Sequence, residues 1–253
     1  MSGTRRLFDS HFHVIDHRFP IVENQGYRPP HFPLADYLAE ATPLGVAGGA
    51  VVSGSFQAFD QTYLLDALGK LGRGWCGVAQ IPADCPDTEI ARLAAAGVRA
   101  VRFNIMRGGI DDFDQLVALA MRCHAVAGWH CELYADASAL APQVSRLSKL
   151  PQIVIDHLGM TEAGLPVLLE LAAAGAKVKA TGFGRVKLDV SKALESIAAR
   201  APAALVFGTD MPSTRAPRPF QAADIDLVVK VLGADLAGRV FWDNAMALYR
   251  MIP

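Results

Sequence analysis

The chain has 253 residues, of which 52% are hydrophobic and only 19% are charged, so a large buried core is possible. Its net charge is −1 without a Lys/Arg cluster, which argues against nucleic acid as a partner. No apolar run approaches the roughly 20 residues that span a bilayer, so no membrane association is expected. The spacing of the four cysteines favours free thiols and a cytoplasmic location (Cys76, Cys85, Cys123, Cys131).

Eight short apolar segments recur along the chain, and each is followed by a stretch with helical character. In chain order, the predicted strands cover residues 7–9, 49–53, 76–80, 100–104, 131–135, 153–157, 177–182 and 205–210. Continuous apolar runs are typical of parallel strands that are covered on both faces. Eight strand–helix repeats predict an α/β fold, a (β/α)₈ TIM barrel, as a single domain over residues 1–253. An open doubly wound sheet is the rival fold, but no Gly-x-Gly-x-x-Gly turn follows an early strand.

The segments between the strands agree with this fold. Apolar stripes with a 3.6-residue period predict helices around residues 113–120, 194–201 and 225–232. Gly97, Gly128 and Gly175 are expected to end helices just before the next strand. Residues 16–33 form a long first loop that should lie over the mouth of the barrel. A last helix near residues 242–250 is expected to pack on the outside.

Polar residues collect where the predicted strands end, which is where barrels of this type place their active sites. His11 and His13 are two residues apart in a strand and therefore point to the same side. His157 ends the sixth strand and Asp210 ends the eighth. The remaining candidates are substrate-binding residues at or after other strand ends: Ser55, Arg102, Arg107, Tyr134 and Arg185.

The charge of Arg102 restricts what can surround it. If Arg102 points inward, it needs an anionic partner, either an acid in the site or a substrate carboxylate. Asp156 is expected to face outward and to be structural.

Taken in order, these motifs resemble the amidohydrolase superfamily, and more closely its amidohydrolase-2 branch, which contains 2-pyrone-4,6-dicarboxylate lactonase. The resemblance rests on Asp-Ser-His-Phe-His at 9–13, Gly-Tyr-Arg-Pro at 26–29, Val-Arg-Phe-Asn at 101–104, Ile-Asp-His-Leu-Gly at 155–159 and Gly-Thr-Asp-Met-Pro at 208–212. Met160 stands where these lactonases have an arginine, and Met211 and Ser213 replace a family Trp and His. The missing arginine leaves both a dicarboxylate and a singly charged lactone open.

The resemblance also bears on metals. Two-metal relatives need Lys or Glu in the fourth strand, where this chain has Arg102-Phe103-Asn104. One-metal relatives usually add a histidine in the fifth strand, where Tyr134 stands. We therefore expect no required cofactor. The alternative is one Zn²⁺ bound by His11, His13 and Asp210.

The predicted activity is that of a lactonase-like carboxylic ester hydrolase. Its substrate would be a small anionic cyclic ester, such as 2-pyrone-4,6-dicarboxylate or a related lactone of aromatic or sugar-acid catabolism. Asp210 would act as general base on a water molecule, and His11, His13 and His157 would stabilise the oxyanion. The arginines would bind carboxylate, while Tyr134 and Ser55 donate hydrogen bonds.

Two other functions stay open at this stage. A Zn-dependent decarboxylase or lyase of the same superfamily would use the same residues. A non-catalytic ligand-binding barrel would bind an anion without turnover. The oligomeric state is not predicted.

Overall fold

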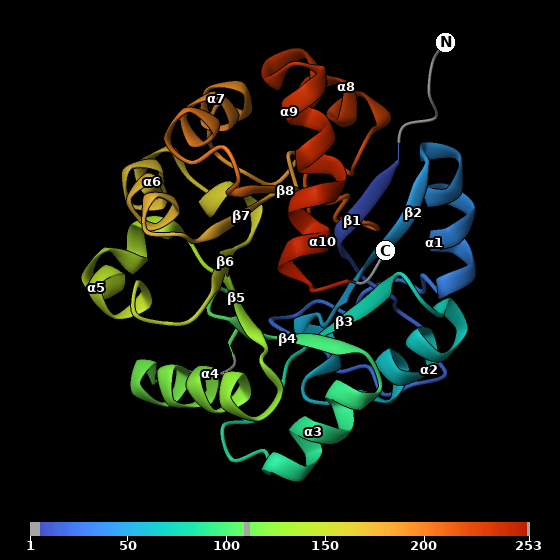
Figure 1. The fold of residues 1–253 in the computed structure, drawn as a ribbon. Coiled ribbons are helices and arrows are strands. Elements are labelled where there is room, and N and C mark those ends of the chain that lie inside the picture. The colour runs from blue at the N-terminus through green and yellow to red at the C-terminus, as the bar shows by residue number, and fades with distance from the viewer. Residues whose placement is uncertain (1–5, 109–111, 252–253) are drawn as a thin grey trace.

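The computed structural model describes residues 6–108 and 112–251, and its centre is an eight-stranded parallel sheet (Figure 1). The strands lie side by side in chain order: β1 (Leu7–Phe12), β2 (Val46–Val52), β3 (Trp75–Ala79), β4 (Val98–Asn104), β5 (His130–Tyr134), β6 (Ile153–Ile155), β7 (Lys177–Ala180) and β8 (Leu205–Phe207). Every predicted strand overlaps an observed one, although the ends differ by a few residues. The predicted (β/α)₈ barrel is confirmed.

The sheet curls so that the segment after β8 meets β1. The Asp210 backbone N–H donates to the His11 carbonyl at 2.7 Å, and the His13 N–H donates to the Met211 carbonyl at 2.8 Å. The buried Asp9 carboxylate reinforces this contact, because it accepts from the His11 N–H at 3.1 Å, the Thr209 N–H at 2.8 Å and the Thr209 hydroxyl at 2.6 Å. The closure therefore fixes His11 and Asp210 relative to each other, although they are far apart in sequence.

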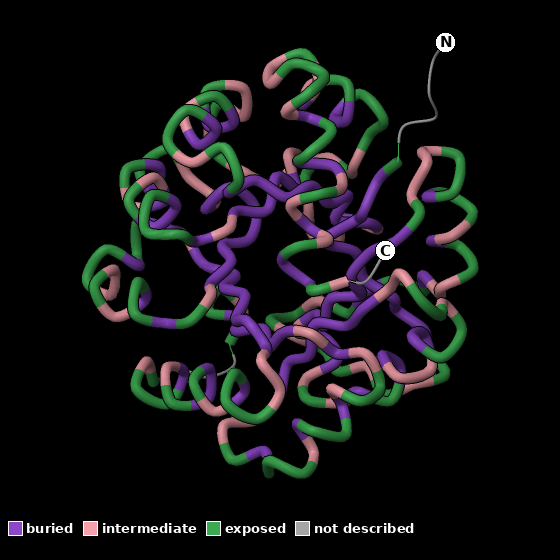
Figure 2. The backbone as a smooth tube through the Cα atoms, viewed as in Figure 1, coloured by how far each residue is buried: buried purple, intermediate pink, exposed green. Residues whose placement is uncertain are grey.

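The helices surround the sheet, as the periodicity predicts. They are α1 (Leu34–Ala41), α2 (Thr62–Leu71), α3 (Asp87–Ala95), α4 (Phe113–Ala127), α5 (Val144–Leu147), α6 (Leu165–Ala173), α7 (Val190–Arg200) and α8 (Ala222–Leu232). Figure 2 shows buried backbone along the strands and inner helix faces, and exposed backbone on the outer faces. Gly97, Gly128 and Gly175 have positive φ values of 106°, 64° and 104°, and each lies between a helix and the next strand, as predicted.

The C-terminal segment differs from the expectation. After α9 (Ala234–Gly238) and a π-helical turn (Arg239–Asp243), α10 (Asn244–Leu248) crosses the amino-terminal end of the barrel (Figure 1). Leu248 and Tyr249 pack in one cluster with side chains from the barrel interior, including Phe8. The prediction of a helix on the outside is wrong. Small interior side chains such as Ala50 and Ala100 leave space at this end, and the C-terminal segment fills it.

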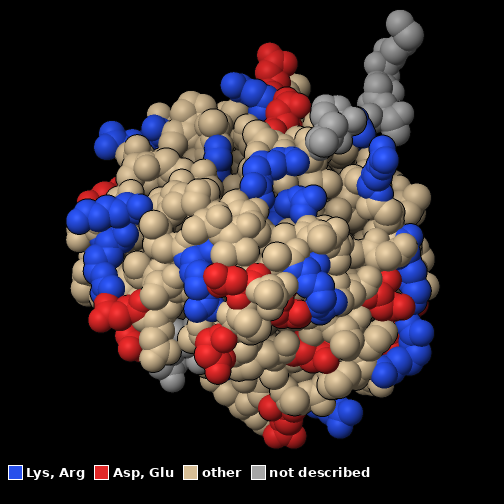
Figure 3. Space-filling model, turned by 60° about the horizontal axis from the view of Figure 1, so that its bottom comes forward, with Lys and Arg blue, Asp and Glu red and all other residues tan. Residues whose placement is uncertain are grey.

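Charges on the surface are mixed. On the face in Figure 3, Lys and Arg side chains lie among Asp and Glu side chains, and the described part of this face has no continuous basic surface of the kind that binds nucleic acid. Among the described residues, no helix is both long enough and apolar enough to span a bilayer.

Candidate active site

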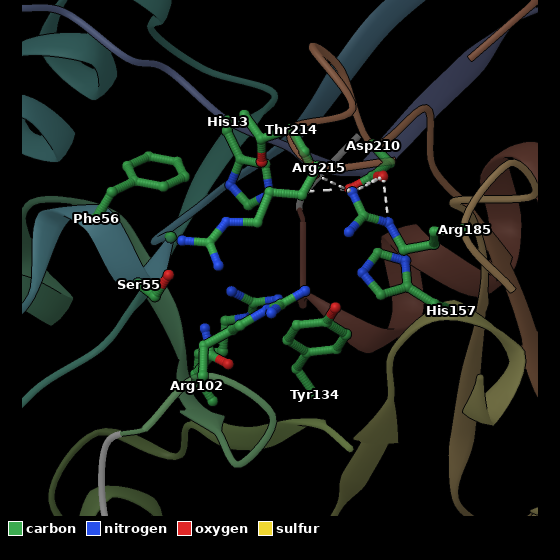
Figure 4. Close-up of a pocket in the computed structure, with 13 residues that line it drawn as sticks. His13, Ser55, Phe56, Arg102, Tyr134, His157, Arg185, Asp210, Thr214 and Arg215 are labelled. Atoms are coloured by element: carbon green, nitrogen blue, oxygen red, sulfur yellow. Dashed lines mark hydrogen bonds and ion pairs between the residues drawn. The ribbon is translucent and has the colours of Figure 1, made fainter. Parts of the chain in front are cut away.

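A pocket opens at the carboxyl ends of the strands (Figure 4). Apart from His11, every predicted site residue lines it: His13, Ser55, Arg102, Arg107, Tyr134, His157, Arg185 and Asp210. His11 is wholly buried beside the pocket, with its ring centroid 5.1 Å from that of His13 and 4.8 Å from that of His157. The lining also includes Asn104, which ends the predicted fourth strand, and residues that the sequence analysis missed: Gly54, Phe56, Thr214 and Arg215.

Asp210 is anchored through one carboxylate oxygen and free at the other. The Arg185 guanidinium donates to Asp210 Oδ2 through Nε at 2.8 Å and also through a terminal nitrogen. Asp210 Oδ1 is buried and has no hydrogen-bond partner within the described structure. His11 Nε2 and His13 Nε2 each lie 3.8 Å from it. Burial raises the pKa of Asp210, and the charge of Arg185 only partly offsets this shift.

The three histidines are neutral near pH 7. Burial, followed by nearby cations, lowers the pKa of His11 and His157 well below the usual value, and it lowers the pKa of His13 to about 3. His13 Nδ1 lies 2.7 Å from the Val52 carbonyl oxygen, which can only accept, so the ring proton is on Nδ1 and Nε2 carries a lone pair. His13 Nε2 and Asp210 Oδ1 are therefore two acceptors 3.8 Å apart. A water molecule between them can donate to both.

A buried ionic network lies beside these groups. Lys179 Nζ is 2.5 Å from Glu132 Oε2, 3.3 Å from His11 Nδ1 and 3.7 Å from Asp156 Oδ1. The ammonium can only donate, so His11 Nδ1 accepts and its Nε2–H points to the side of Asp210. Burial raises the pKa of Glu132, while Lys179 and His130 lower it, and the net pKa lies below its usual value.

Sequence reasoning missed Lys179 and Glu132. The available signal was a charged residue in the middle of a short apolar strand, where a buried charge needs a partner.

Arg102 and Asp156 form a second buried ion pair. Arg102 donates to Asp156 Oδ2 from Nε at 3.2 Å and from a terminal nitrogen at 3.0 Å, and its other terminal nitrogen donates to the Ser53 carbonyl at 2.7 Å. The expectation that Asp156 faces outward is therefore wrong. β6 ends at Ile155, and His157 then takes a left-handed φ of 51°. This turn allows Asp156 and His157 to lie on the inner side of the barrel together.

The first loop reaches the mouth, as its length and composition predicted. The Asn24 side-chain amide donates to the Arg107 carbonyl oxygen at 2.9 Å. The Arg107 guanidinium in turn donates to Gln25 Oε1 at 3.0 Å. Through Asn24 and Gln25 the first loop therefore contacts Arg107, which lines the pocket.

A candidate metal-ligand group also lies here. Among the described residues, His11, His157 and Asp210 each offer one ligand atom, and these atoms lie within 4.8 Å of one another. His11 Nε2, His157 Nδ1 and Asp210 Oδ1 have no hydrogen-bond partners in the described structure. The group differs from the predicted alternative set, which had His13 in place of His157.

The fold and the site define a class of barrel enzyme with His-x-His at the end of β1, a histidine after β6 and an aspartate after β8. The sequence pattern of the amidohydrolase family matches residues 8–251. The chain belongs to this amidohydrolase family, which confirms the resemblance drawn from its motifs.

Three relatives give the closer context. A 2-pyrone-4,6-dicarboxylate hydrolase of Comamonas testosteroni is 33% identical over 156 residues, which cover 60% of this chain and 51% of that protein. A 4-sulfomuconolactone hydrolase of Rhizobium radiobacter is 27% identical over 97% of this chain and 90% of its own length. A solved structure from Pseudomonas putida, named as a candidate 2-pyrone-4,6-dicarboxylic acid hydrolase, superposes with a TM-score of 0.85 at 27% identity and covers 97% of this chain and 98% of that one. The first match spans about half of that relative's length.

Proposed function

We propose that the protein hydrolyses a small anionic lactone, with Asp210 as the general base. The observation that carries this proposal is the state of the Asp210 carboxylate. Arg185 holds one oxygen, while the other is buried and faces neutral histidines in a pocket lined by arginines. Such a group can take a proton from water, because burial raises its pKa and its free oxygen points to the reaction space.

The first step consumes one water molecule. Water between His13 Nε2 and Asp210 Oδ1 loses a proton to Asp210, and its oxygen forms a bond to the lactone carbonyl carbon. Negative charge then develops on the carbonyl oxygen, where the His11 Nε2–H is available as a donor. In the second step the ring C–O bond breaks, and Asp210 returns the proton to the departing oxygen. The product is an open-chain acid.

The pocket's charges support an anionic substrate. Four arginines line it: Arg102, Arg107, Arg185 and Arg215. The named relatives are hydrolases of a 2-pyrone, which is an unsaturated lactone, and of a muconolactone, and these names carry carboxylate and sulfonate groups. Four free, buried cysteines support a cytoplasmic compartment for this catabolic reaction.

The charges around the candidate ligands do not fit a divalent cation well. A metal-bound histidine normally donates its second ring N–H to an acceptor. His11 Nδ1 lies 3.5 Å from the Asp156 carboxylate but also 3.3 Å from the Lys179 ammonium, whose positive charge disfavours a cation bound to the same ring. Arg185 already pairs with the Asp210 carboxylate. These contacts favour a water or substrate oxygen in the space between His11, His157 and Asp210. We propose that the hydrolysis requires no metal, and the Zn-dependent lyase is the alternative.

A panel of lactones tests both parts of the proposal. Purified enzyme should release one proton per turnover from an anionic lactone, measured with a pH indicator. The rate should be unchanged after chelator treatment that metal analysis shows to be complete. Loss of activity on metal removal would overturn the metal-free mechanism. Release of CO₂ without hydrolysis of any lactone would replace the proposed reaction by the lyase, and binding without turnover would favour the non-catalytic barrel.

Arg102→Met should raise KM and also destabilise the fold. The first effect follows if Arg102 binds a substrate carboxylate in both the ground state and the transition state. The second follows because Asp156 stays buried without its guanidinium, and breaking a buried pair costs about 3–5 kcal/mol. Steady-state kinetics and thermal melts measure the two effects. The double variant Arg102→Met/Asp156→Asn should recover stability but not KM, and recovery of both would contradict a substrate-binding role.

A further inference from the structure

A second cavity lies at the amino-terminal end of the barrel, away from the candidate active site. Its walls come from residues at or just before the start of β1, β2, β3 and β4 and from the C-terminal segment around α10, which crosses this end of the barrel in Figure 1. The cavity has a volume of about 530 Å³ and shares no lining residue with the active-site pocket. Ligand pockets commonly measure about 300–1,000 Å³, so a small organic molecule fits this space.

Four arginines give this cavity its charge, and they are far apart in the sequence: Arg6, Arg73, Arg99 and Arg250. None of the described residues that line the cavity is Asp or Glu. The charge balance therefore differs from that of the active-site pocket, where Arg102 and Arg185 each pair with a carboxylate. Because the four positions are spread along the chain, the sequence shows no basic cluster that would reveal them.

Within the described structure, the contacts of these arginines are with neutral groups. Arg99 donates from one terminal nitrogen to two backbone carbonyls, both at 3.0 Å, and Arg250 donates to the Ala127 carbonyl at 3.4 Å. The two contacts hold the Arg99 guanidinium in place and leave its second terminal nitrogen available to donate. Arg73 is exposed and has no hydrogen-bond or ion-pair partner among the described residues.

Guanidinium groups without acidic partners produce a positive potential that favours an anion in the space between them. The net charge of the whole chain is only −1, so this positive charge is a local feature. The planar N–H donors of a guanidinium match the oxygens of a carboxylate or a phosphate. An anion with more than one negative charge is needed to pair with several of these arginines at once.

The rest of the lining is largely apolar. Trp242, Met246 and Met251 line the cavity, and each is only partly buried by the rest of the protein. The Arg6 guanidinium carbon lies 3.6 Å from the centroid of the Trp242 ring, so a guanidinium already stacks on an aromatic ring in this wall. Since arginine stacks on aromatic faces as well as pairing with carboxylates, the cavity can bind both a flat ring and the acidic groups attached to it.

We propose that this cavity is a second binding site, which takes a small planar organic anion with two or more negative charges. The arginines pair with its acidic groups, and Trp242 and the two methionines contact its ring. Aromatic polycarboxylates and nucleotides share this chemistry. The site lies outside the active-site pocket, and the proposal does not depend on the lactone hydrolysis.

Calorimetry with two probes tests the site and distinguishes the two sources of such an anion. The probes are AMP and benzene-1,3,5-tricarboxylate. Arg73→Gln and Arg99→Gln should each lower the affinity for a probe that binds by about 10-fold or more, because a charge-assisted hydrogen bond is lost. Adenosine, which lacks the charge, and inorganic phosphate, which lacks the ring, should both bind more weakly than that probe.

A matched control separates this result from a general loss of positive charge. Arg200 is an exposed arginine on α7 and lines neither cavity, so Arg200→Gln should leave both affinities unchanged. Arg73→Gln should keep the wild-type melting temperature, since Arg73 has no partner in the described structure to lose. If neither probe binds, or if a probe binds equally well to wild type, Arg73→Gln and Arg99→Gln, the second site is wrong.

A second copy of the chain is the competing occupant of this surface, and sedimentation velocity separates it from a small anion. The oligomeric state should be the same with and without the probe and in Arg73→Gln. A wild-type dimer that dissociates in Arg73→Gln or Arg99→Gln would identify the cavity as a protein interface and overturn the proposal. None of these measurements needs turnover, so a protein that hydrolyses no lactone can still confirm the site, and a lactone hydrolase that binds neither probe refutes the site alone.

Discussion

Asp210→Asn is expected to lower kcat by at least about a hundredfold while the barrel remains folded, because a general base contributes about 10²–10⁴ in rate. The amide keeps an oxygen that can accept from Arg185, but it cannot take a proton from water. The residual activity should also lose the acid limb of the kcat/KM profile. In the wild type, kcat/KM should fall on acidification at a pH above the usual pKa range of an aspartate, since burial raises the pKa of Asp210.

The competing explanation is that Asp210 only supports the mouth of the barrel by pairing with Arg185. In that case Asp210→Asn would lower the melting temperature and leave kcat within a few-fold of wild type. Asp224 provides a matched control, because it is a mostly buried carboxylate that pairs with Arg218 at 2.8 Å and does not line the pocket. Asp224→Asn should reduce stability without affecting kcat.

Lys179→Met is expected to be the most destabilising of the substitutions considered. The side chain is wholly buried, and its ammonium lies between Glu132, Asp156 and His11. Removing one partner of a buried ion pair costs about 3–5 kcal/mol, which corresponds to a melting temperature lower by about 10 °C in a chain of this size. Thermal melts monitored by circular dichroism measure this directly. Lys177→Met is the control, because Lys177 lies in the same strand but its ammonium donates to a backbone carbonyl at 2.7 Å rather than to a buried carboxylate.

The stability loss in Lys179→Met should depend on pH, and the pKa of Glu132 gives the direction. In the wild type the net pKa of Glu132 lies below its usual value, so its contribution to stability is present above the unfolded pKa and is lost as pH falls through the folded pKa. Without Lys179, burial dominates and raises the pKa of Glu132 in the folded variant. The folded variant therefore gains stability on acidification, because Glu132 binds a proton more readily there than in the unfolded chain. The gap in melting temperature between wild type and variant should therefore narrow as pH falls. A gap that widens on acidification would contradict a charged Lys179–Glu132 pair, and Lys179→Met/Glu132→Gln should recover part of the lost stability.

The barrel could be predicted from the sequence because the patterns that indicate its strands and helices are local. Continuous apolar runs mark strands buried on both faces, and a 3.6-residue period marks the helices between them. Position along the chain then placed His11, His13, His157 and Asp210 together, since parallel strands end at one face of a barrel. These arguments need only the order of residues and the geometry of a regular strand or helix.

Tertiary structure decided what regular periodicity could not. The direction of Asp156 depends on where β6 ends and on the left-handed turn at His157. The Lys179–Glu132 pair joins side chains from β7 and β5 inside the barrel, and Arg215 reaches the pocket through a loop outside any regular element. α10 crosses the base of the barrel because small interior residues leave space there. The residue order determined which groups reach the catalytic end, whereas which charges are paired and which face the substrate depended on three-dimensional contacts between strands and loops.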